Sequence, residues 1–324
     1  METAAFSQKI LRILSSEKPI LRAYQALNKT PVRHAVKACV SALHPSLKRR
    51  RAAVAETHCG RKLDSFEKTC VRQLRENGYA RLDGQLDPQL LERLLTYSAD
   101  KLKRLEALAR DQAVQTKSFW VRLSDEELTG KTLTPQNILV EFALQERLLR
   151  IASEYLGEAA FLQYILLTQS LPSDKPLTAS QLWHQDRDDV KMLKVFVYLT
   201  DVTELACGPF TFYDAETSRS VRNSFFMRHL PDQEIYSQLP SKPIQMTGPK
   251  LSAFVVDTSR CYHMGSRLES GHSRLMYTGL YIGLPAIFPW NGKNQIVADA
   301  NDPALTELQS FALKAEGPGE RRAT

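Results

Sequence analysis

Two different spacings of apolar residues divide the chain. Up to about residue 157, apolar residues recur every three or four positions, as the leucines between 88 and 105 do, which is typical of amphipathic helices. Beyond residue 157 they form short runs that are rich in β-branched and aromatic residues. Pro, Gly, Ser and Asp separate these runs. The pattern predicts helices first and a β-domain second.

Turn and capping residues predict where several elements begin and end. The Asn-Gly pair at 77–78 supplies a left-handed C-cap, so we expect a helix to end there and a short strand to follow at 79–83. The Asp-Pro pair at 87–88 is a cap and first turn for a long helix. We expect a further helix over 134–157, because a glycine follows its last apolar residue.

Five segments are predicted to be strands, at 160–169, 194–200, 208–213, 251–257 and 274–283. No regular helical pattern lies between them. This favours an antiparallel sandwich or barrel over a doubly wound parallel sheet. The expected fold class is therefore α+β with a mainly β core.

Composition is that of one soluble globular domain. The chain has 324 residues, 43% of them hydrophobic, and no run approaches the roughly 18 to 20 apolar residues that span a bilayer. The five cysteines are odd in number and form no CxxC pair, so neither a disulfide framework nor a structural zinc site is expected. We expect a cytoplasmic protein, with no transmembrane segment.

Positive charge is concentrated in residues 1–56, although the whole chain carries only +7. This segment is a helical extension with a solvated charged face, or it lies on an anionic membrane surface as a peripheral anchor. Nucleic acid is a less expected partner. We therefore divide the chain into a basic helical extension (1–60), a main domain (61–290) and a C-terminal helix or tail (291–324).

The strongest chemical signal is a histidine and an aspartate separated by one residue. Side chains two apart on a strand point to the same side, so His184 and Asp186 could bind one ion. His263 follows the apolar run 251–256 and supplies a second imidazole. Two histidines and one carboxylate on one face of an octahedron are typical of non-haem Fe(II) oxygenases, although catalytic zinc stays open.

Arg274 begins the last predicted strand, eleven residues after His263. If the metal chelates the keto-acid end of 2-oxoglutarate, the far carboxylate needs a fixed cation deeper in the pocket. A guanidinium meets it with a bidentate fork, which lysine cannot match. The full set of His184, Asp186, His263 and Arg274 is far more informative than an isolated His-x-Asp, which is usually accidental.

Three segments carry a family resemblance: "LRENGYARLDGQLDPQLLERL", then "WHQD" followed by a strand and "CGPF", and finally "YHMGSRLESGHSR". Together they resemble the phytanoyl-CoA dioxygenase family of Fe(II)/2-oxoglutarate oxygenases over residues 61–289. The resemblance implies a double-stranded β-helix, a cupin-like jelly roll flanked by helices, with iron near one mouth.

The resemblance also implies the chemistry. Fe(II) is held by His184, Asp186 and His263, and 2-oxoglutarate binds both the iron and Arg274. With O2, such an enzyme hydroxylates an unactivated C–H bond of a small-molecule, lipid or sugar-linked metabolite and releases succinate and CO2. Related halogenating enzymes carry a small residue in place of the carboxylate, so Asp186 disfavours halogenation.

Gln169 and Ser266 are further candidates for contact with 2-oxoglutarate. The chain departs from the family at two places. Gly265 stands where many members have a serine, and "PFTFYDAETSRSVRNS" follows Gly208 where many have Pro-Gly-Ser-His. Both departures leave the substrate open.

Two other readings compete with an oxygenase. One is a noncatalytic jelly-roll binding protein that retains a metal for structure. The other is a peripheral membrane or nucleic-acid module that acts through its basic N-terminus. The remaining histidines have no partners comparable to those of the predicted site; they are His34, His44, His58, His229 and His272.

Overall fold

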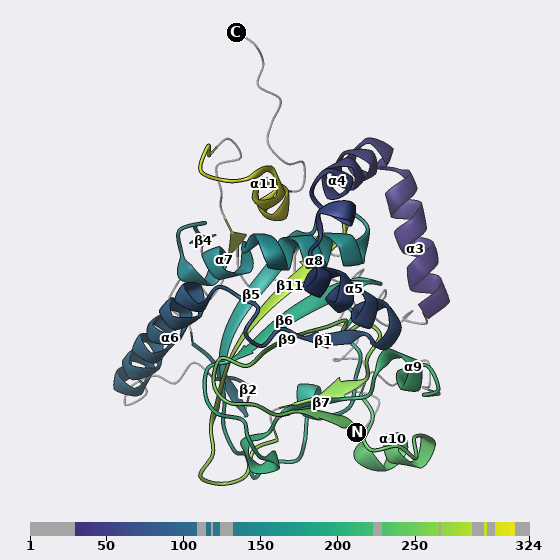
Figure 1. Cartoon of the computed structure of the whole chain (residues 1–324). Coiled ribbons are helices and arrows are strands. Elements are labelled where there is room, and N and C mark those ends of the chain that lie inside the picture. Colours follow the sequence, from purple (N-terminus) through teal and green to yellow (C-terminus); the bar gives the residue numbers. More distant parts are fainter. Residues whose placement is uncertain are drawn as a thin grey trace, which may run out of the picture.

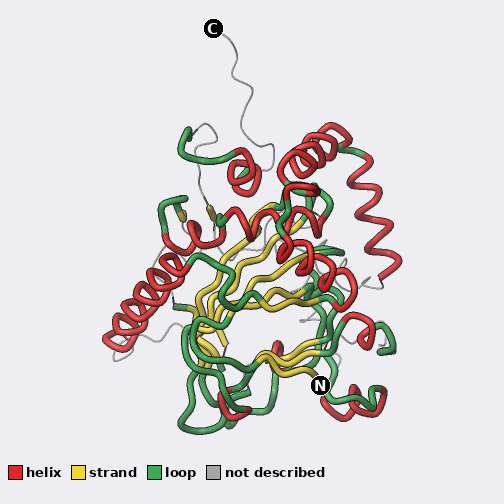
Figure 2. Tube along the Cα trace, in the orientation of Figure 1, coloured by secondary structure: helices red, strands yellow, loops and turns green. Residues whose placement is uncertain are grey.

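Helices cover one side of a large antiparallel sheet, and a smaller sheet faces its other side (Figures 1 and 2). This computed structural model describes residues 30–108, 115–117, 119–123, 132–222, 229–265, 267–286, 295–296 and 302–314. The expected combination of helices with an antiparallel sheet is confirmed.

The longer helices precede the main strands, as predicted, but the short helices α9 and α10 lie between the strands, where no helix was expected. The described helices are α3 (Thr30–Ala42), α4 (Pro45–His58), α5 (Ser65–Asn77), α6 (Pro88–Leu108), α7 (Ile138–Ala143), α8 (Glu146–Leu156), α9 (Ala215–Ser218), α10 (Asp232–Gln238) and α11 (Glu307–Leu313), with short 3-10 turns η1 (Gly60–Lys62), η2 (Ala179–Gln181) and η3 (Leu205–Cys207). The described strands are β1 (Tyr79–Arg81), β2 (Gln115–Lys117), β3 (Trp120–Arg122), β4 (Thr132–Leu133), β5 (Phe161–Ser170), β6 (Met192–Tyr198), β7 (Phe210–Phe212), β8 (Ile244–Met246), β9 (Ala253–Val256), β10 (His263–Met264), β11 (Arg274–Ile282) and β12 (Gln295–Ile296).

The ends of α5 confirm the prediction from its capping residues. The Asp64 side chain accepts the backbone N–H of Glu67 at 2.7 Å, and Glu67 in turn accepts that of Asp64. At the other end Gly78 adopts the left-handed conformation, with φ of 83°, and its N–H bonds the carbonyl of Leu74. β1 begins with the next residue.

The prediction of a single helix over 134–157 is wrong. Two helices form instead, and the side chain of Asn137 caps the first, which begins only at Ile138. The chain then becomes extended at Gln145, with φ of −54° and ψ of 128°, before α8 starts. Only the end at Gly157 agrees with the prediction.

The large sheet has the strand order β1-β9-β6-β11-β5-β3-β2, and neighbouring strands are antiparallel. Successive side chains on each strand point to opposite faces. One face carries the residues of the main core and is covered by α5, α7, α8 and α11 (Figure 1). The hydroxyls of Tyr277 and Tyr281 on β11 donate to carbonyls of α7, at Leu139 (2.8 Å) and Ala143 (2.7 Å). These bonds fix the strand against the helix layer.

A second core lies between the large sheet and the three-stranded sheet β10-β7-β8 (Figure 2). Phe210 of β7 packs on Phe196 of β6, with ring centroids 4.7 Å apart, and on Phe254 of β9, at 5.8 Å. Met246 of β8 belongs to the same cluster. The two sheets therefore share one apolar interior.

Arg51 joins the N-terminal helix α4 to the C-terminal helix α11. Its side chain is fully buried and donates to three carbonyls, those of Ala159 (2.6 Å), Phe311 (2.9 Å) and Lys314 (3.2 Å). Burial lowers the pKa of the guanidinium to about 10, and Glu158 partly opposes this.

Helix α3 contacts the loop that leads into β6. Lys37 donates to the carboxylate of Asp189 at 2.7 Å and to the carbonyls of Gly283 (2.9 Å) and Pro285 (2.7 Å). Arg33 donates to the Asp189 carbonyl at 2.7 Å. Asp189 is 1% exposed, and burial raises the pKa of its carboxyl, although Lys37 opposes the shift.

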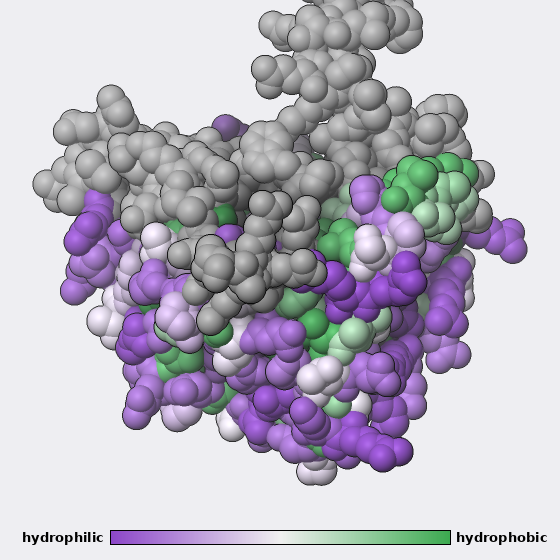
Figure 3. Space-filling view, turned by 90° about the horizontal axis from the view of Figure 1, so that it is seen from above, coloured by the Kyte–Doolittle hydropathy of each residue, from purple (hydrophilic) through white to green (hydrophobic). Residues whose placement is uncertain are grey.

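Much of the predicted N-terminal extension, residues 1–29, lies outside the described residues, so its contact with a membrane or with nucleic acid stays a prediction. Among the described helices, none is both long and apolar enough to cross a membrane. Hydrophilic side chains dominate the described part of the face in Figure 3, and apolar ones gather near one edge.

Replacing Arg51 with alanine should lower the free energy of unfolding by about 3 kcal/mol, because three buried carbonyls lose a charged donor and a cavity remains. Urea denaturation measures this. Arg49→Ala is the matched control, because Arg49 is exposed and bonds only weakly within its own helix, at 3.4 Å. Equal unfolding midpoints for the two variants would contradict the role given to Arg51.

Candidate metal centre

His184 and His263 are held side by side by their own backbones. The N–H of His184 donates to the carbonyl of His263 at 3.0 Å, and the reverse bond is 2.9 Å. His263 begins β10, whereas His184 forms an isolated bridge, so the expectation that it lies on a regular strand is wrong. The N–H of Asp186 is anchored on the Thr258 carbonyl at 2.8 Å. The imidazole ring centroids are 4.3 Å apart.

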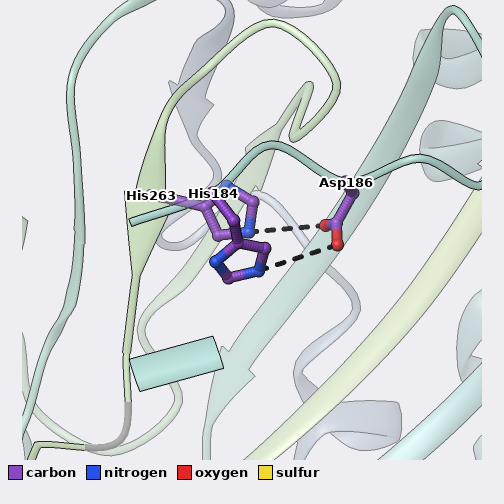
Figure 4. A group of neighbouring side chains, drawn as sticks. All are labelled: His184, Asp186 and His263. Carbon is purple, nitrogen blue, oxygen red and sulfur yellow. Dashed lines mark ion pairs between the residues drawn. The ribbon is translucent and has the colours of Figure 1, made fainter. Parts of the chain in front are cut away.

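Backbone carbonyls set the tautomer of both rings. Nδ1 of His184 bonds the carbonyl of Leu182 at 2.8 Å, and Nδ1 of His263 bonds that of Cys261 at 2.9 Å. A carbonyl oxygen only accepts, so each Nδ1 carries a proton, and Nε2 is the nitrogen of each ring that remains to bind a metal. Both Nε2 atoms point at Asp186, from 3.9 Å for His184 and 3.4 Å for His263 (Figure 4).

The three side chains fit one metal ion. Their ligand atoms lie within 4.8 Å of one another. Bonds of about 2.1 Å at right angles would place neighbouring ligand atoms about 3 Å apart, so the ligands need only small shifts. His184 and His263 are 6% and 5% exposed. Two neutral imidazoles and one carboxylate on one side of an ion leave further positions open.

Burial keeps His184 in the form that binds metal. Desolvation lowers the pKa of His184 well below its usual value, and the nearby His263 adds to the effect. The ring is therefore uncharged at neutral pH. A histidine must be deprotonated to bind a metal, so His184 does not have to lose a proton first.

Lys194 is a contact of the centre that we did not predict from the sequence. It lies on β6, its side chain is 10% exposed, and Nζ is 2.5 Å from Oδ2 of Asp186. Burial alone would raise the pKa of Asp186, but Lys194 and His263 outweigh it and hold that pKa well below its usual value. One feature of the sequence could have indicated this contact: Lys194 is a lysine inside a run of β-branched and aromatic residues, where a charged side chain needs a partner.

Arg274 lies on the same face of the large sheet as Ser170, its partner in register on β5. It is 2% exposed, its Nη2 donates to the Ser170 hydroxyl at 3.3 Å, and its Nη1 donates to the carbonyl of Gly208. A Cβ on Gly265 would lie 3.7 Å from Nη2. Because Gly265 follows His263 by two residues, the guanidinium lies beside the segment that carries this histidine.

The structure does not bring Gln169 to this cluster. Gln169 pairs with Leu275, so it lies on the helix-covered face, opposite to Arg274. This argues against the expected contact of Gln169 with 2-oxoglutarate, whereas Ser170 lies on the same face as Arg274. Ser266, the other candidate, lies outside the described residues.

His229 was expected to have no comparable partner, and the structure corrects this. Its ring centroid is 5.2 Å from that of His184. Its distance along the chain from both ligand segments hid this contact.

Comparisons with known proteins give only distant similarities. No family model and no curated protein matches the chain. Among solved structures, the chain is similar to the epimerase SnoN, in complex with Fe3+, alpha-ketoglutarate and nogalamycin RO, with 18% identity, a TM-score of 0.49, and coverage of 70% of this chain and 87% of that chain. It is also similar to EctD from S. alaskensis with 2-oxoglutarate and 5-hydroxyectoine, with 14% identity, a TM-score of 0.49, and coverage of 73% and 88%. At these values the function has to be argued from the site itself.

Replacing His263 with alanine should weaken Fe(II) binding about 100-fold or more, because only two ligands remain. Anaerobic equilibrium dialysis measures the affinity. His58→Ala is the control, since His58 pairs with the partly exposed Glu307. Undiminished Fe(II) binding by the His263 variant would exclude the metal centre described here.

Replacing Lys194 with methionine should make Fe(II) binding more sensitive to acid. Lys194 holds the pKa of Asp186 low, so its loss raises that pKa, and protons then compete with the metal at a higher pH. Fe(II) affinity should fall at a higher pH in the variant than in the wild type as the pH is lowered. Lys191→Met is the control, because Lys191 donates to the carbonyl of Tyr155 instead. Identical pH profiles would show that Lys194 does not tune the carboxylate.

Proposed function

We propose that this chain is an Fe(II)- and 2-oxoglutarate-dependent dioxygenase that hydroxylates an unactivated C–H bond of a small-molecule, lipid or sugar-linked metabolite. The observation that carries the proposal is the convergence of His184, Asp186 and His263, with Arg274 beside the segment of the second histidine. In this proposal the two facing sheets form the double-stranded β-helix of the phytanoyl-CoA dioxygenase family.

His184, Asp186 and His263 would hold the iron. Their two neutral nitrogens and one carboxylate occupy one side of the ion, which leaves room for a chelating co-substrate. Lys194 would keep one oxygen of Asp186 engaged, so that the carboxylate is oriented before the metal arrives. Iron, 2-oxoglutarate and O2 together supply an oxidant that attacks an unactivated C–H bond, with succinate and CO2 as further products.

Arg274 would bind the far carboxylate of 2-oxoglutarate. A guanidinium buried to 2% exposure is costly to desolvate, and a carboxylate ligand offsets that cost with two charge-assisted hydrogen bonds. Ser170 and the Gly208 carbonyl orient the fork from its other edges. The missing side chain at Gly265 leaves the approach to the fork unobstructed.

Aromatic rings would keep water away from the iron. Phe210 stacks on His263 with centroids 5.3 Å apart, and Phe196 packs on Phe210. Apolar side chains packed against His263 exclude water from the site. This strengthens the electrostatic interactions there and protects reaction intermediates from side reactions with water.

Replacing Arg274 with lysine should weaken 2-oxoglutarate binding about 10- to 100-fold, because the charge remains but the bidentate fork is lost. An anaerobic titration of the Fe(II) protein with 2-oxoglutarate, followed by the visible charge-transfer band, measures the affinity. Arg93→Lys is the control, since Arg93 pairs with Glu141 on the helix side. An unchanged affinity in the Arg274 variant would remove this residue from the site.

The enzymatic activity itself is tested by succinate release from 2-oxoglutarate in the presence of metabolite pools. The proposal expects substrate-stimulated succinate that the Asp186→Ala variant does not produce. Fe(II) binding without a charge-transfer band and without succinate from any pool would instead support a noncatalytic protein that retains a metal.

A further inference from the structure

A second group of metal-ligating side chains lies apart from the iron ligands. Glu204, Cys207 and His272 present a carboxylate, a thiol and an imidazole whose ligand atoms all lie within 4.8 Å of one another. Cys207 is 8% exposed, His272 is half-buried and Glu204 is exposed. The group thus has its thiol in the interior of the protein and its carboxylate at the surface.

The separation of sulfur and nitrogen fits a tetrahedral ion. Zinc bonds of about 2.3 Å to sulfur and about 2.1 Å to nitrogen, at the tetrahedral angle, hold these two atoms about 3.6 Å apart. The observed distance from Cys207 Sγ to His272 Nδ1 is 3.6 Å. The Glu204 carboxylate is on an exposed side chain, so it can close the third position without disturbing packing.

We propose that Glu204, Cys207 and His272 form a second metal site, selective for Zn2+ over the hard cations. A thiolate and an imidazole suit a borderline-soft ion, whereas Mg2+ and Ca2+ prefer oxygen ligands alone. The thiolate and the carboxylate together neutralise the two charges of the ion. Three protein ligands leave the fourth position to water.

The backbone already holds the two ligand segments together. The N–H of Glu269 donates to the carbonyl of Ala206 at 3.0 Å, and the N–H of His272 donates to the Glu269 carbonyl at 3.2 Å. Gly208, next to Cys207, is left-handed with φ of 64°, and a Cβ there would lie 2.8 Å from the Leu268 side chain. The turn at Gly208 therefore packs closely against Leu268, which brings the segments of Cys207 and His272 together.

An ion at this site would act on the surroundings of Arg274. Gly208, whose carbonyl accepts from Arg274, follows Cys207 directly, and His272 precedes Arg274 by two residues. The ion would cross-link the turn at Gly208 to the segment that leads into β11. Zn2+ should therefore raise the Tm of the wild-type protein, and Cys207→Ser should reduce that rise.

Cobalt spectroscopy of the full chain tests the site, because Co2+ bound to a thiolate gives a sulfur-to-metal charge-transfer band. The centre at His184, Asp186 and His263 has no sulfur ligand and cannot give this band. We expect the band in the wild type and in His184→Ala, and its loss in Cys207→Ser. Cys39→Ser is the matched control and should keep the band, since Cys39 is an exposed thiol on α3.

Zn2+ stoichiometry gives a second readout that does not depend on the cysteine variant. Equilibrium dialysis should find one Zn2+ fewer in His272→Gln than in the wild type. A wild type without the band, a band that survives in Cys207→Ser, or equal stoichiometry in His272→Gln would overturn the proposal. The Cys207–His272 contact would then be a thiol hydrogen bond only.

Discussion

The reciprocal backbone pairing of His184 and His263 is the constraint on which the centre depends. Two hydrogen bonds between these residues hold their rings together, although they come from distant parts of the chain. Two carbonyls then fix both tautomers, and the Thr258 carbonyl holds the third member, Asp186. The geometry of the three side chains is thus set largely by hydrogen bonds to main-chain atoms.

Because side chains alternate between the two faces of the large sheet, one face packs against the helices and the other carries the charged side chains of the candidate site. Residues of one parity meet the helices and form the main core. Those of the other parity include two buried cations, Lys194 and Arg274, and the aromatic residues that join the two sheets. Lys194 pairs with the Asp186 carboxylate, while Arg274 lies farther along the same face.

Features that depend on neighbouring residues within one segment could be predicted from the sequence. Contacts between distant segments could not. The five main strands, the end of α5 and the candidate ligands all followed from local residue order. The choice between Gln169 and Ser170 required the register of β5 against β11, because a shift of one residue moves a side chain to the other face. The same limit explains the missed contacts of Lys194 and His229, whose partners lie on other segments.

Helix α3 makes the N-terminal part of the protein a structural support of the cluster of His184, Asp186 and His263. Lys37 neutralises Asp189, which is three residues beyond Asp186 and almost fully enclosed. A shortened chain that began after this helix would leave an enclosed carboxylate among the carbonyls of Gly283 and Pro285 without its lysine. That carboxylate would have to take up a proton or bind water, and the loop that carries Asp186 would lose a contact that holds it in place. Trimming the basic N-terminus as a dispensable appendage would therefore damage the site from a distance.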